Sequence, residues 1–161
     1  DLACGPGHTT RFLYELGMRY IVGLDLSDGM IREATSQSAG QIRFLQGDML
    51  LLPFADGEIA NIICFYGIVH FSPADLIIAV AEWWRVLRKG GQVLFSFHIG
   101  SEKTYLEEFL GEKVSITFCY FEVSEVLKIL TTRGFEIKEV IERHPYSEEY
   151  PTKRAYFTIE K

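Results

Sequence analysis

The feature that most constrains the fold is an alternation of short apolar runs with helical segments along the first hundred residues. The runs YIVGLDLS, QIRFLQGD, EIANIICFYG and GGQVLFSFHIG are rich in β-branched and aromatic residues and predict buried strands. Between them, apolar residues recur at spacings of three and four, which predicts helices over 9–16, 27–39 and 73–88. Alternating elements with short connections predict a Rossmann-like α/β fold, a doubly wound and mostly parallel sheet with helices on both faces.

The last third of the chain has a different character. Residues 101–121 carry aromatic side chains among acids, with no clean period beyond a short helix predicted at 103–110. A helix is predicted over 122–133, ended by Gly134. The runs FEIKEVIER and RAYFTIEK then alternate apolar and polar residues, which predicts an antiparallel hairpin closing one edge of the sheet. The length of 161 residues corresponds to a single domain, 1–161.

Composition excludes several classes of function. The net charge is −6, with no basic stripe, so we expect no nucleic-acid partner. No apolar stretch approaches the roughly 20 residues of a membrane span, so we expect no membrane partner and a cytoplasmic protein. Cys4, Cys64 and Cys119 are odd in number and far apart, which indicates reduced thiols. The four scattered histidines lack ligand spacing, so no metal site is predicted.

Three features follow successive predicted strands, at the edge where open α/β sheets bind ligands. The turn Gly5-Pro6-Gly7 allows the backbone to approach a ligand closely. Asp25 ends the next strand, where its carboxylate can accept hydrogen bonds from two ribose hydroxyls. Asp48 ends the third, within reach of an exocyclic adenine amine. Together these residues outline a site for a nucleoside across three strand ends.

In order and spacing, DLACGPG, GLDLSDGMIREA, GDMLLLPFADGEIANIICFYGIVHF and RVLRKGGQVLFSF resemble the successive motifs of class I S-adenosylmethionine-dependent methyltransferases of the small-molecule type. The resemblance covers residues 1–99 closely and the remainder in outline. It implies S-adenosylmethionine as cofactor, a cofactor-binding half at 1–99, and a substrate-side insertion with the closing hairpin at 100–161. Ala3 stands where many relatives have glycine, a minor departure.

The resemblance also implies a cofactor-binding set drawn from four segments. Its members are Asp1, Ala3, Gly5 and Gly7 beneath the methionine part, Asp25 at the ribose, Leu26 and Met30 against the adenine, Asp48 at the adenine amine, Met49 at the ring edge through its backbone, and Phe65 and Tyr66 beside the methionine amine and the sulfonium. The reaction expected of this fold is direct in-line displacement, for which the protein chiefly supplies alignment and desolvation.

Several alternatives stay open from the residues alone. His70 is the candidate catalytic base, and the competing interpretation is a polar residue lining the cleft. The run VSITFCYF, with Tyr105, Phe109 and Tyr146, either lines a substrate pocket or packs an insertion on the sheet. The preferred function is methyl transfer to a small, partly apolar metabolite. The alternative is a noncatalytic cofactor-binding or interaction module, or an inactive fragment of a methyltransferase.

A nicotinamide-dependent dehydrogenase is disfavoured, because its glycine motif would need glycine where Thr10 stands. The first predicted strand has only about four residues, when strands usually have about five or six. We therefore expect a methyltransferase that lacks its N-terminal segment, with an open slot between the strands near residues 20–25 and 60–65. Such a slot is able to recruit the edge of another chain, and a homodimer is one assembly that it allows.

Overall fold

The computed structural model describes residues 1–101, 103–109 and 112–161. The elements, in chain order, are α1 His8–Glu15, β1 Val22–Asp25, α2 Asp28–Gln37, β2 Arg43–Gln46, β3 Ile59–Phe65, the 3-10 turn η1 Gly67–His70, α3 Pro73–Val86, β4 Leu87–His98, β5 Lys103–Phe109, β6 Glu112–Cys119, α4 Val123–Arg133, β7 Glu136–Arg143 and β8 Arg154–Glu160. No helix among these residues is long and apolar enough to cross a membrane.

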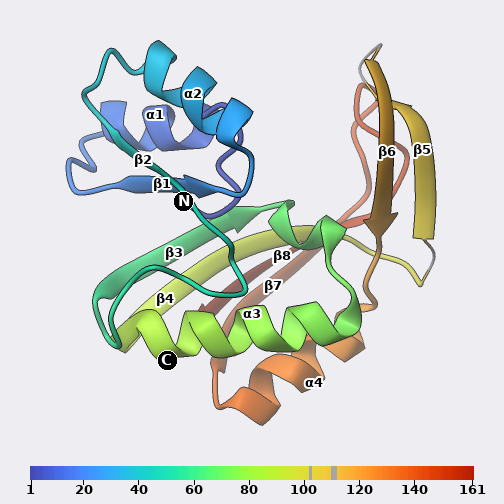
Figure 1. The fold of residues 1–161 in the computed structure, drawn as a ribbon. Coiled ribbons are helices and arrows are strands. Elements are labelled where there is room, and N and C mark those ends of the chain that lie inside the picture. The colour runs from blue at the N-terminus through green and yellow to red at the C-terminus, as the bar shows by residue number, and fades with distance from the viewer. Residues whose placement is uncertain (102, 110–111) are drawn as a thin grey trace.

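The strands form a mostly parallel arrangement whose middle is the start of the chain. β1 pairs with β2 in parallel, and a second sheet has the order β3-β4-β8-β7, with β3 and β4 parallel and the last two strands antiparallel. Residues 1–4 join the two parts, because the Leu2 amide donates to the Ile63 carbonyl and the Leu24 amide donates to the Asp1 carbonyl, both at 2.8 Å. In Figure 1, α1 and α2 lie above the strands and α3 and α4 below them. This confirms the predicted Rossmann-like class.

Local signals fix the ends of the helices. The Ser27 hydroxyl accepts from the Met30 amide at the start of α2. Ser72 and Asp75 form a reciprocal capping box at the start of α3, with Pro73 as its first residue. Gly134 ends α4 with a φ of 114°, in the left-handed region that favours glycine.

The core lies between the larger sheet and α3 with α4. Trp83 and Phe95 are fully buried, with ring centroids 5.3 Å apart. The helical spacing over 73–88 predicts Trp84 inside and Trp83 partly exposed, and this is wrong: Trp83 is fully buried, whereas Trp84 is only half-buried and packs edge-on against Phe135. Ile77, which the same spacing predicts on the inner face, is 56% exposed. α3 packs on both β4 and α4, and its buried residues are Leu76, Ala79, Val80, Trp83 and Val86.

Residues 103–109 are not helical, contrary to the prediction of a short helix at 103–110. They form β5, which pairs antiparallel with β6 in a separate two-stranded ribbon. The ribbon stands up from the sheet on the side away from α3 and α4, beside the connection between β7 and β8 (Figure 1). The side chain of Phe109, expected among the substrate-side aromatic residues, lies outside the part that the structure describes. The cysteines Cys4, Cys64 and Cys119 are free and buried, as predicted.

A cavity of about 520 Å³ lies between the start of β1 and the start of β3. This is the place where an open slot was predicted, and we call the cavity the strand slot. Its lining includes Asp1, the segment 18–22, Leu52, Phe54 and the segment 58–63. The strand slot lies at the amino ends of the strands, away from the three features at their carboxyl ends.

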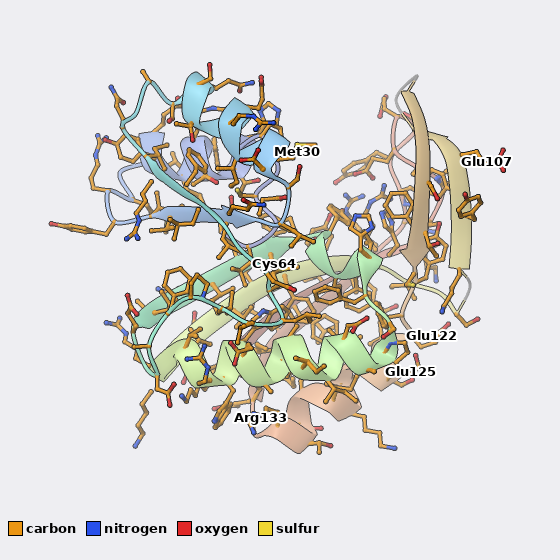
Figure 2. The ribbon with its side chains drawn as sticks, viewed as in Figure 1. Met30, Cys64, Glu107, Glu122, Glu125 and Arg133 are labelled. Carbon is orange, nitrogen blue, oxygen red and sulfur yellow. The ribbon has the colours of Figure 1, made fainter. Side chains whose placement is uncertain are left out.

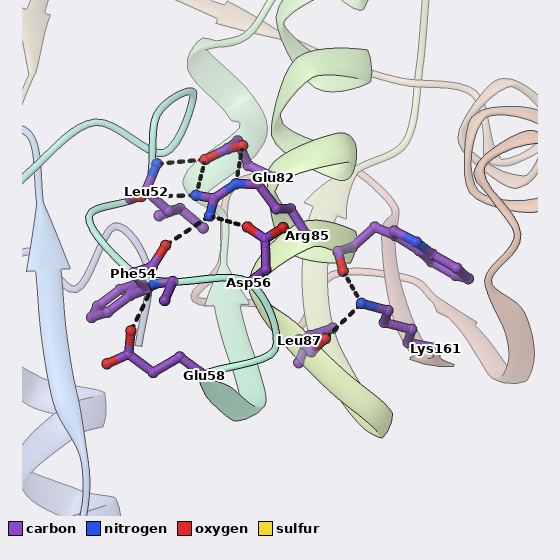
Figure 3. Close-up of polar contacts among 10 residues, drawn as sticks. Leu52, Phe54, Asp56, Glu58, Glu82, Arg85, Leu87 and Lys161 are labelled. Carbon is purple, nitrogen blue, oxygen red and sulfur yellow. Dashed lines mark hydrogen bonds and ion pairs between the residues drawn. The ribbon is translucent and has the colours of Figure 1, made fainter.

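One wall of the strand slot is held by α3 (Figure 3). The Arg85 guanidinium donates to the carbonyl oxygens of Leu52 and Phe54, at 2.9 and 2.7 Å. It also pairs with Glu82, whose other contact is the Leu52 amide at 2.8 Å. Arg85 therefore fixes the connection between β2 and β3 through two backbone carbonyls of that loop, and it also pairs with the Asp56 carboxylate in the loop at 3.0 Å.

Candidate functional site

The glycine turn and Asp25 form one unit at the carboxyl ends of the strands. The Gly5 amide donates to Asp25 Oδ2 at 2.8 Å, and the Ser27 amide donates to Asp25 Oδ1 at 2.9 Å. Gly5 and Gly7 both have positive φ, 53° and 79°, which favours glycine. A Cβ on Gly5 would meet nothing within 4 Å, whereas a Cβ on Gly7 would meet the Phe44 ring at 2.8 Å. Gly5 thus borders open space and Gly7 packs the turn onto β2.

Asp1 supports the turn from below. Its carboxylate accepts a hydrogen bond of 2.5 Å from the Thr10 hydroxyl on α1, and Thr10 is fully buried. Thr10 stands where the glycine motif of a nicotinamide-dependent dehydrogenase would need glycine. In this chain, it links the start of α1 to Asp1, four residues before Gly5.

Between the glycine turn and η1, Gly67 packs closely against Cys64 and Ala3, and these three residues form the floor of the candidate site. A Cβ on Gly67 would lie 2.7 Å from Cys64 Sγ and 2.8 Å from the Ala3 Cβ. Ala3 has a φ of 53°, in the left-handed region. Met49 closes the group, since its sulfur lies 3.9 Å from Cys64 Sγ, and burial raises the pKa of the Cys64 thiol to about 12. This cluster ties three segments of the expected cofactor site together.

Two exposed apolar side chains and one exposed acid complete the rim. Leu26 is 68% exposed and Met30 is 44% exposed. Figure 2 shows Met30 at the end of α2 that faces the β5–β6 ribbon. Asp48 is exposed, and its Oδ1 accepts from the Leu50 amide at 2.8 Å. The Gly47 amide donates to the Asp25 carbonyl, so Asp48 follows directly on the strand beside Asp25.

Tyr66 connects this site to the other half of the sheet. It follows β3 with a φ of 57°, a left-handed conformation that is uncommon for tyrosine. Its hydroxyl lies 2.9 Å from the Tyr156 hydroxyl on β8, which accepts from Arg143 on β7, also at 2.9 Å. Arg143 is in turn paired with both carboxylate oxygens of Glu149. Burial, followed by the hydrogen bond between the Tyr66 and Tyr156 hydroxyls, raises the pKa of Tyr66 to about 12, so the phenol stays protonated at neutral pH.

His98 belongs to the same cluster. Its ring stacks on Tyr66 with centroids 4.9 Å apart, and its Nδ1 lies 2.6 Å from the Thr152 hydroxyl. Tyr120 and Tyr150 contact the ring edge-on. Burial and the nearby Arg154 guanidinium lower the pKa of His98, which favours the neutral imidazole.

The structure places the other predicted residues as follows. His70 is exposed at the end of η1, with its ring 5.2 Å from that of Phe118 on β6. Phe65 is half-buried at the end of β3. The predicted residues of the glycine turn, β1 and β2 are thus brought together, and Tyr66 with His70 borders them toward the ribbon. The cluster of Tyr156, Arg143 and His98 was missed, and only the alternation of β4, β7 and β8 could have shown that these side chains share one face.

Comparisons with known proteins identify the family. Residues 1–91 match the family described as "Methyltransferase domain". A malonyl-[acyl-carrier protein] O-methyltransferase of Hamiltonella defensa is 34% identical over 142 residues, covering 86% of this chain and 53% of that protein. The enzyme of the same name from Serratia marcescens is 40% identical over 96 residues, which are 60% of this chain and 36% of that protein. The chain spans from about a third to about half of these curated relatives.

Solved structures agree on the fold. A methyltransferase from Methanosarcina mazei superimposes with a TM-score of 0.88 at 16% identity, over 100% of this chain and 90% of that one. A methyltransferase from Mesorhizobium loti gives 0.78 at 19% identity, over 100% of this chain and 89% of that one. Since the family match covers more than half of the chain and the motif order agrees with it, the chain belongs to the class I S-adenosylmethionine-dependent methyltransferases.

Proposed function

We propose that this chain binds S-adenosylmethionine and transfers its methyl group to a small, partly apolar molecule. The observation that carries the proposal is the joined unit of glycine turn and Asp25, with the Gly5 amide bonded to the carboxylate at 2.8 Å. Among the relatives are proteins named malonyl-[acyl-carrier protein] O-methyltransferase and demethylmenaquinone methyltransferase, names that support methylation of a small molecule.

The residues present fit the cofactor. Each Asp25 oxygen accepts one backbone amide, which leaves lone pairs for the two ribose hydroxyls. Leu26 and Met30 offer exposed apolar surface for an adenine ring, and Asp48 has a free carboxylate oxygen for its amine. The open space beside Gly5 leaves room for the methionine part. Asp1, Ala3, Gly7, Met49 and Phe65 form the support and border of that space.

When bound, the cofactor supplies a methyl carbon on a sulfonium, which is already a good leaving group. The chain then has to align the acceptor and exclude water. Tyr66 stays protonated, so we assign it as a hydrogen-bond donor to the acceptor and not as a base. Where the acceptor carries a proton, we assign its removal to His70, which is exposed on the turn directly after Tyr66.

The test is calorimetric titration with S-adenosylhomocysteine, S-adenosylmethionine and NAD. We expect binding of the first two and none of NAD. Asp25→Ala should weaken binding by about tenfold to a hundredfold, since hydrogen bonds to a charged group contribute about 1.5–3 kcal/mol. Asp28→Ala is the matched control, because Asp28 is a nearby exposed acid whose partner among the described residues is Arg32 on its own helix.

Turnover is a separate question from binding. When the chain is tested with a panel of carboxylic acid, phenol and quinol acceptors, it should release S-adenosylhomocysteine with at least one of these classes. Binding that depends on Asp25 but yields no product with any acceptor would reduce the chain to a noncatalytic cofactor-binding module. Folded protein that binds neither cofactor form would refute the proposal as a whole.

A further inference from the structure

Three polar side chains form a row across β7, β8 and β4, which lie side by side in the larger sheet (Figure 1). Arg143 on β7 is directly opposite Arg154 on β8, and Arg154 is directly opposite His98 on β4. Side chains directly opposite each other on antiparallel strands share one face of the sheet. The His98 ring stacks on Tyr66, so this row, which we call the arginine row, adjoins the acceptor side of the candidate site.

The charges of the arginine row are not balanced. Like charges directly opposite each other on neighbouring strands destabilise a sheet, and Arg143 and Arg154 are such a pair. Glu149 is the acid that pairs with them: its two oxygens accept from Arg143, and one of them lies 3.3 Å from Arg154. The hydrogen bonds from Arg143 lower the pKa of Glu149 to about 2, so Glu149 is ionised. One carboxylate for two guanidinium groups leaves one positive charge in excess among these described side chains.

Arg154 carries its charge in a place that water hardly reaches. Its side chain is 5% exposed; one terminal nitrogen donates to the Thr152 carbonyl at 2.9 Å, whereas Nε has no hydrogen-bond partner among the described residues. Ser96, two residues before His98 and therefore on the same face of β4, has a buried Oγ that also lacks a partner in the described part of the chain. Buried polar groups are normally hydrogen-bonded, so these two atoms indicate a ligand at this face.

A second hydrogen-bond donor lies near Arg154. The Tyr156 hydroxyl accepts from Arg143 and lies 2.9 Å from the Tyr66 hydroxyl, so it can donate its own proton to Tyr66. The Tyr66 proton is then free to bond to a ligand. Burial, followed by the bond with Tyr156, raises the pKa of Tyr66 to about 12, and the nearby Arg154 guanidinium opposes that rise. A protonated phenol beside a guanidinium offers the donors that a carboxylate accepts, and one carboxylate would balance the excess charge.

We propose that the arginine row binds a single carboxylate of the acceptor molecule, with Arg154 Nε and the Tyr66 hydroxyl as its donors. Arg154 is then the residue that selects acceptors with a negative charge, while Glu149 and Arg143 hold the row in place. The inference rests on the proposed function for the statement that the ligand is the methyl acceptor. The binding of the carboxylate is measured without turnover.

The probe is hexanoate, a partly apolar monocarboxylate, and its matched control is hexanamide, which has nearly the same shape and no charge. Ligand-observed NMR titration of the 161-residue chain, saturated with S-adenosylhomocysteine, gives both affinities. We expect hexanoate to bind about tenfold more tightly than hexanamide, because hydrogen bonds to a charged group are stronger than those between neutral groups.

Two variants change the charge of the row in opposite directions. Arg154→Gln should remove the preference for hexanoate. Glu149→Gln should tighten hexanoate about threefold or more and leave hexanamide unchanged, because it removes a negative charge close to the ligand. Glu149 is 28% exposed, so this second variant remains a test if Arg154→Gln does not fold. Glu148→Gln is the matched control, since Glu148 is the adjacent, exposed acid, and both affinities should stay within about twofold.

The Nε–H resonance of Arg154 locates the bound carboxylate. It is identified in a nitrogen-15 spectrum by its loss in Arg154→Gln. Hexanoate should move it downfield, and hexanamide should leave it in place. A role of Arg154 in folding alone would not produce this difference between the two compounds.

Four results would overturn the inference. They are no binding of hexanoate at millimolar concentration, equal affinities for hexanoate and hexanamide, a preference for hexanoate that Arg154→Gln retains, and equal tightening by Glu148→Gln and Glu149→Gln, which would be a general effect of net charge. Failure of the proposed function has a different signature, which is folded protein that binds neither cofactor form. The same titrations without S-adenosylhomocysteine would then still test whether the arginine row binds a carboxylate.

Discussion

Gly67 is the position where a single added methyl group should disturb the floor of the candidate site most. A Cβ there would lie 2.7 Å from Cys64 Sγ and 2.8 Å from the Ala3 Cβ, so each contact is about 1 Å shorter than the optimum. Cys64 is fully buried, and Ala3 lies between residues that pair with β1 and β3. Neither neighbour moves freely. Because the φ of Gly67 lies outside the left-handed region, the cost is steric and not conformational.

We therefore expect Gly67→Ala to lower the free energy of unfolding by about 2 kcal/mol, within the range for overpacked cores. For a chain of this length, that corresponds to a fall in melting temperature of about 4–8 °C. Ala3→Gly removes the opposing methyl and relieves a left-handed alanine, so the double variant should recover about half of the loss. Urea unfolding of the four proteins gives the coupling energy directly.

Gly29→Ala is the matched control, since a Cβ there meets only Ser27 Oγ, at 3.6 Å, inside helix α2. It should stabilise the chain by about 0.5–1 kcal/mol. The reasoning would be refuted by a Gly67→Ala variant within about 0.5 kcal/mol of the parent. Equal losses with and without Ala3→Gly would show that Ala3 is not the obstacle.

Three further predictions test other parts of the structure. Ser72→Ala removes the hydroxyl of the α3 capping box and should cost about 1 kcal/mol in thermal unfolding; an unchanged melting temperature would contradict the cap. The pKa of His98 is lowered in the folded protein, so the unfolded state binds its proton first as pH falls below about 6.5. Stability should therefore drop on acidification through that region, and His98→Gln should flatten the dependence in urea titrations from pH 7.5 to 5. Arg85→Met should speed amide exchange over residues 52–58 while α4 keeps its protection, because the guanidinium holds that loop by its carbonyls. Unchanged protection of residues 52–58 in the variant would show that Arg85 does not hold the loop.

The parts of the fold that the sequence predicted are those that depend on local chemistry. Ser27, Pro73 and Gly134 mark helix ends through contacts within a few residues, and the structure has helix ends at all three. The parallel order of the first half follows from the alternation of elements. Residues 103–109 were predicted wrongly because their state is decided by pairing with β6, where Thr104 faces Phe118. Such pairing leaves no periodicity in the local sequence from which the strand could be predicted.

The candidate site likewise has one side that depends on local chemistry and one side that depends on strand register. Its cofactor side is local, since Gly5 and Asp25 lie 20 positions apart on neighbouring elements of one βαβ unit. Its other side depends on register: Tyr66 and Tyr156 are 90 positions apart, and they meet because β8 inserts beside β4 with Ser96 opposite Tyr156. No motif in the first hundred residues specifies that register.

From this division of the site we predict how Tyr156→Phe affects cofactor affinity and turnover. Among the described residues, the Tyr156 hydroxyl bonds to Tyr66 and Arg143, and Tyr66 is the one of these two that is assigned to the cofactor. Tyr156→Phe should therefore leave the calorimetric affinity for S-adenosylhomocysteine within about twofold of the parent, while any acceptor that turns over loses rate through a misplaced Tyr66. A tenfold loss of cofactor affinity, about 1.4 kcal/mol, would show that the hydroxyl pair belongs to the cofactor side. The two sides would then be one site, and the register of β8 would control cofactor binding as well.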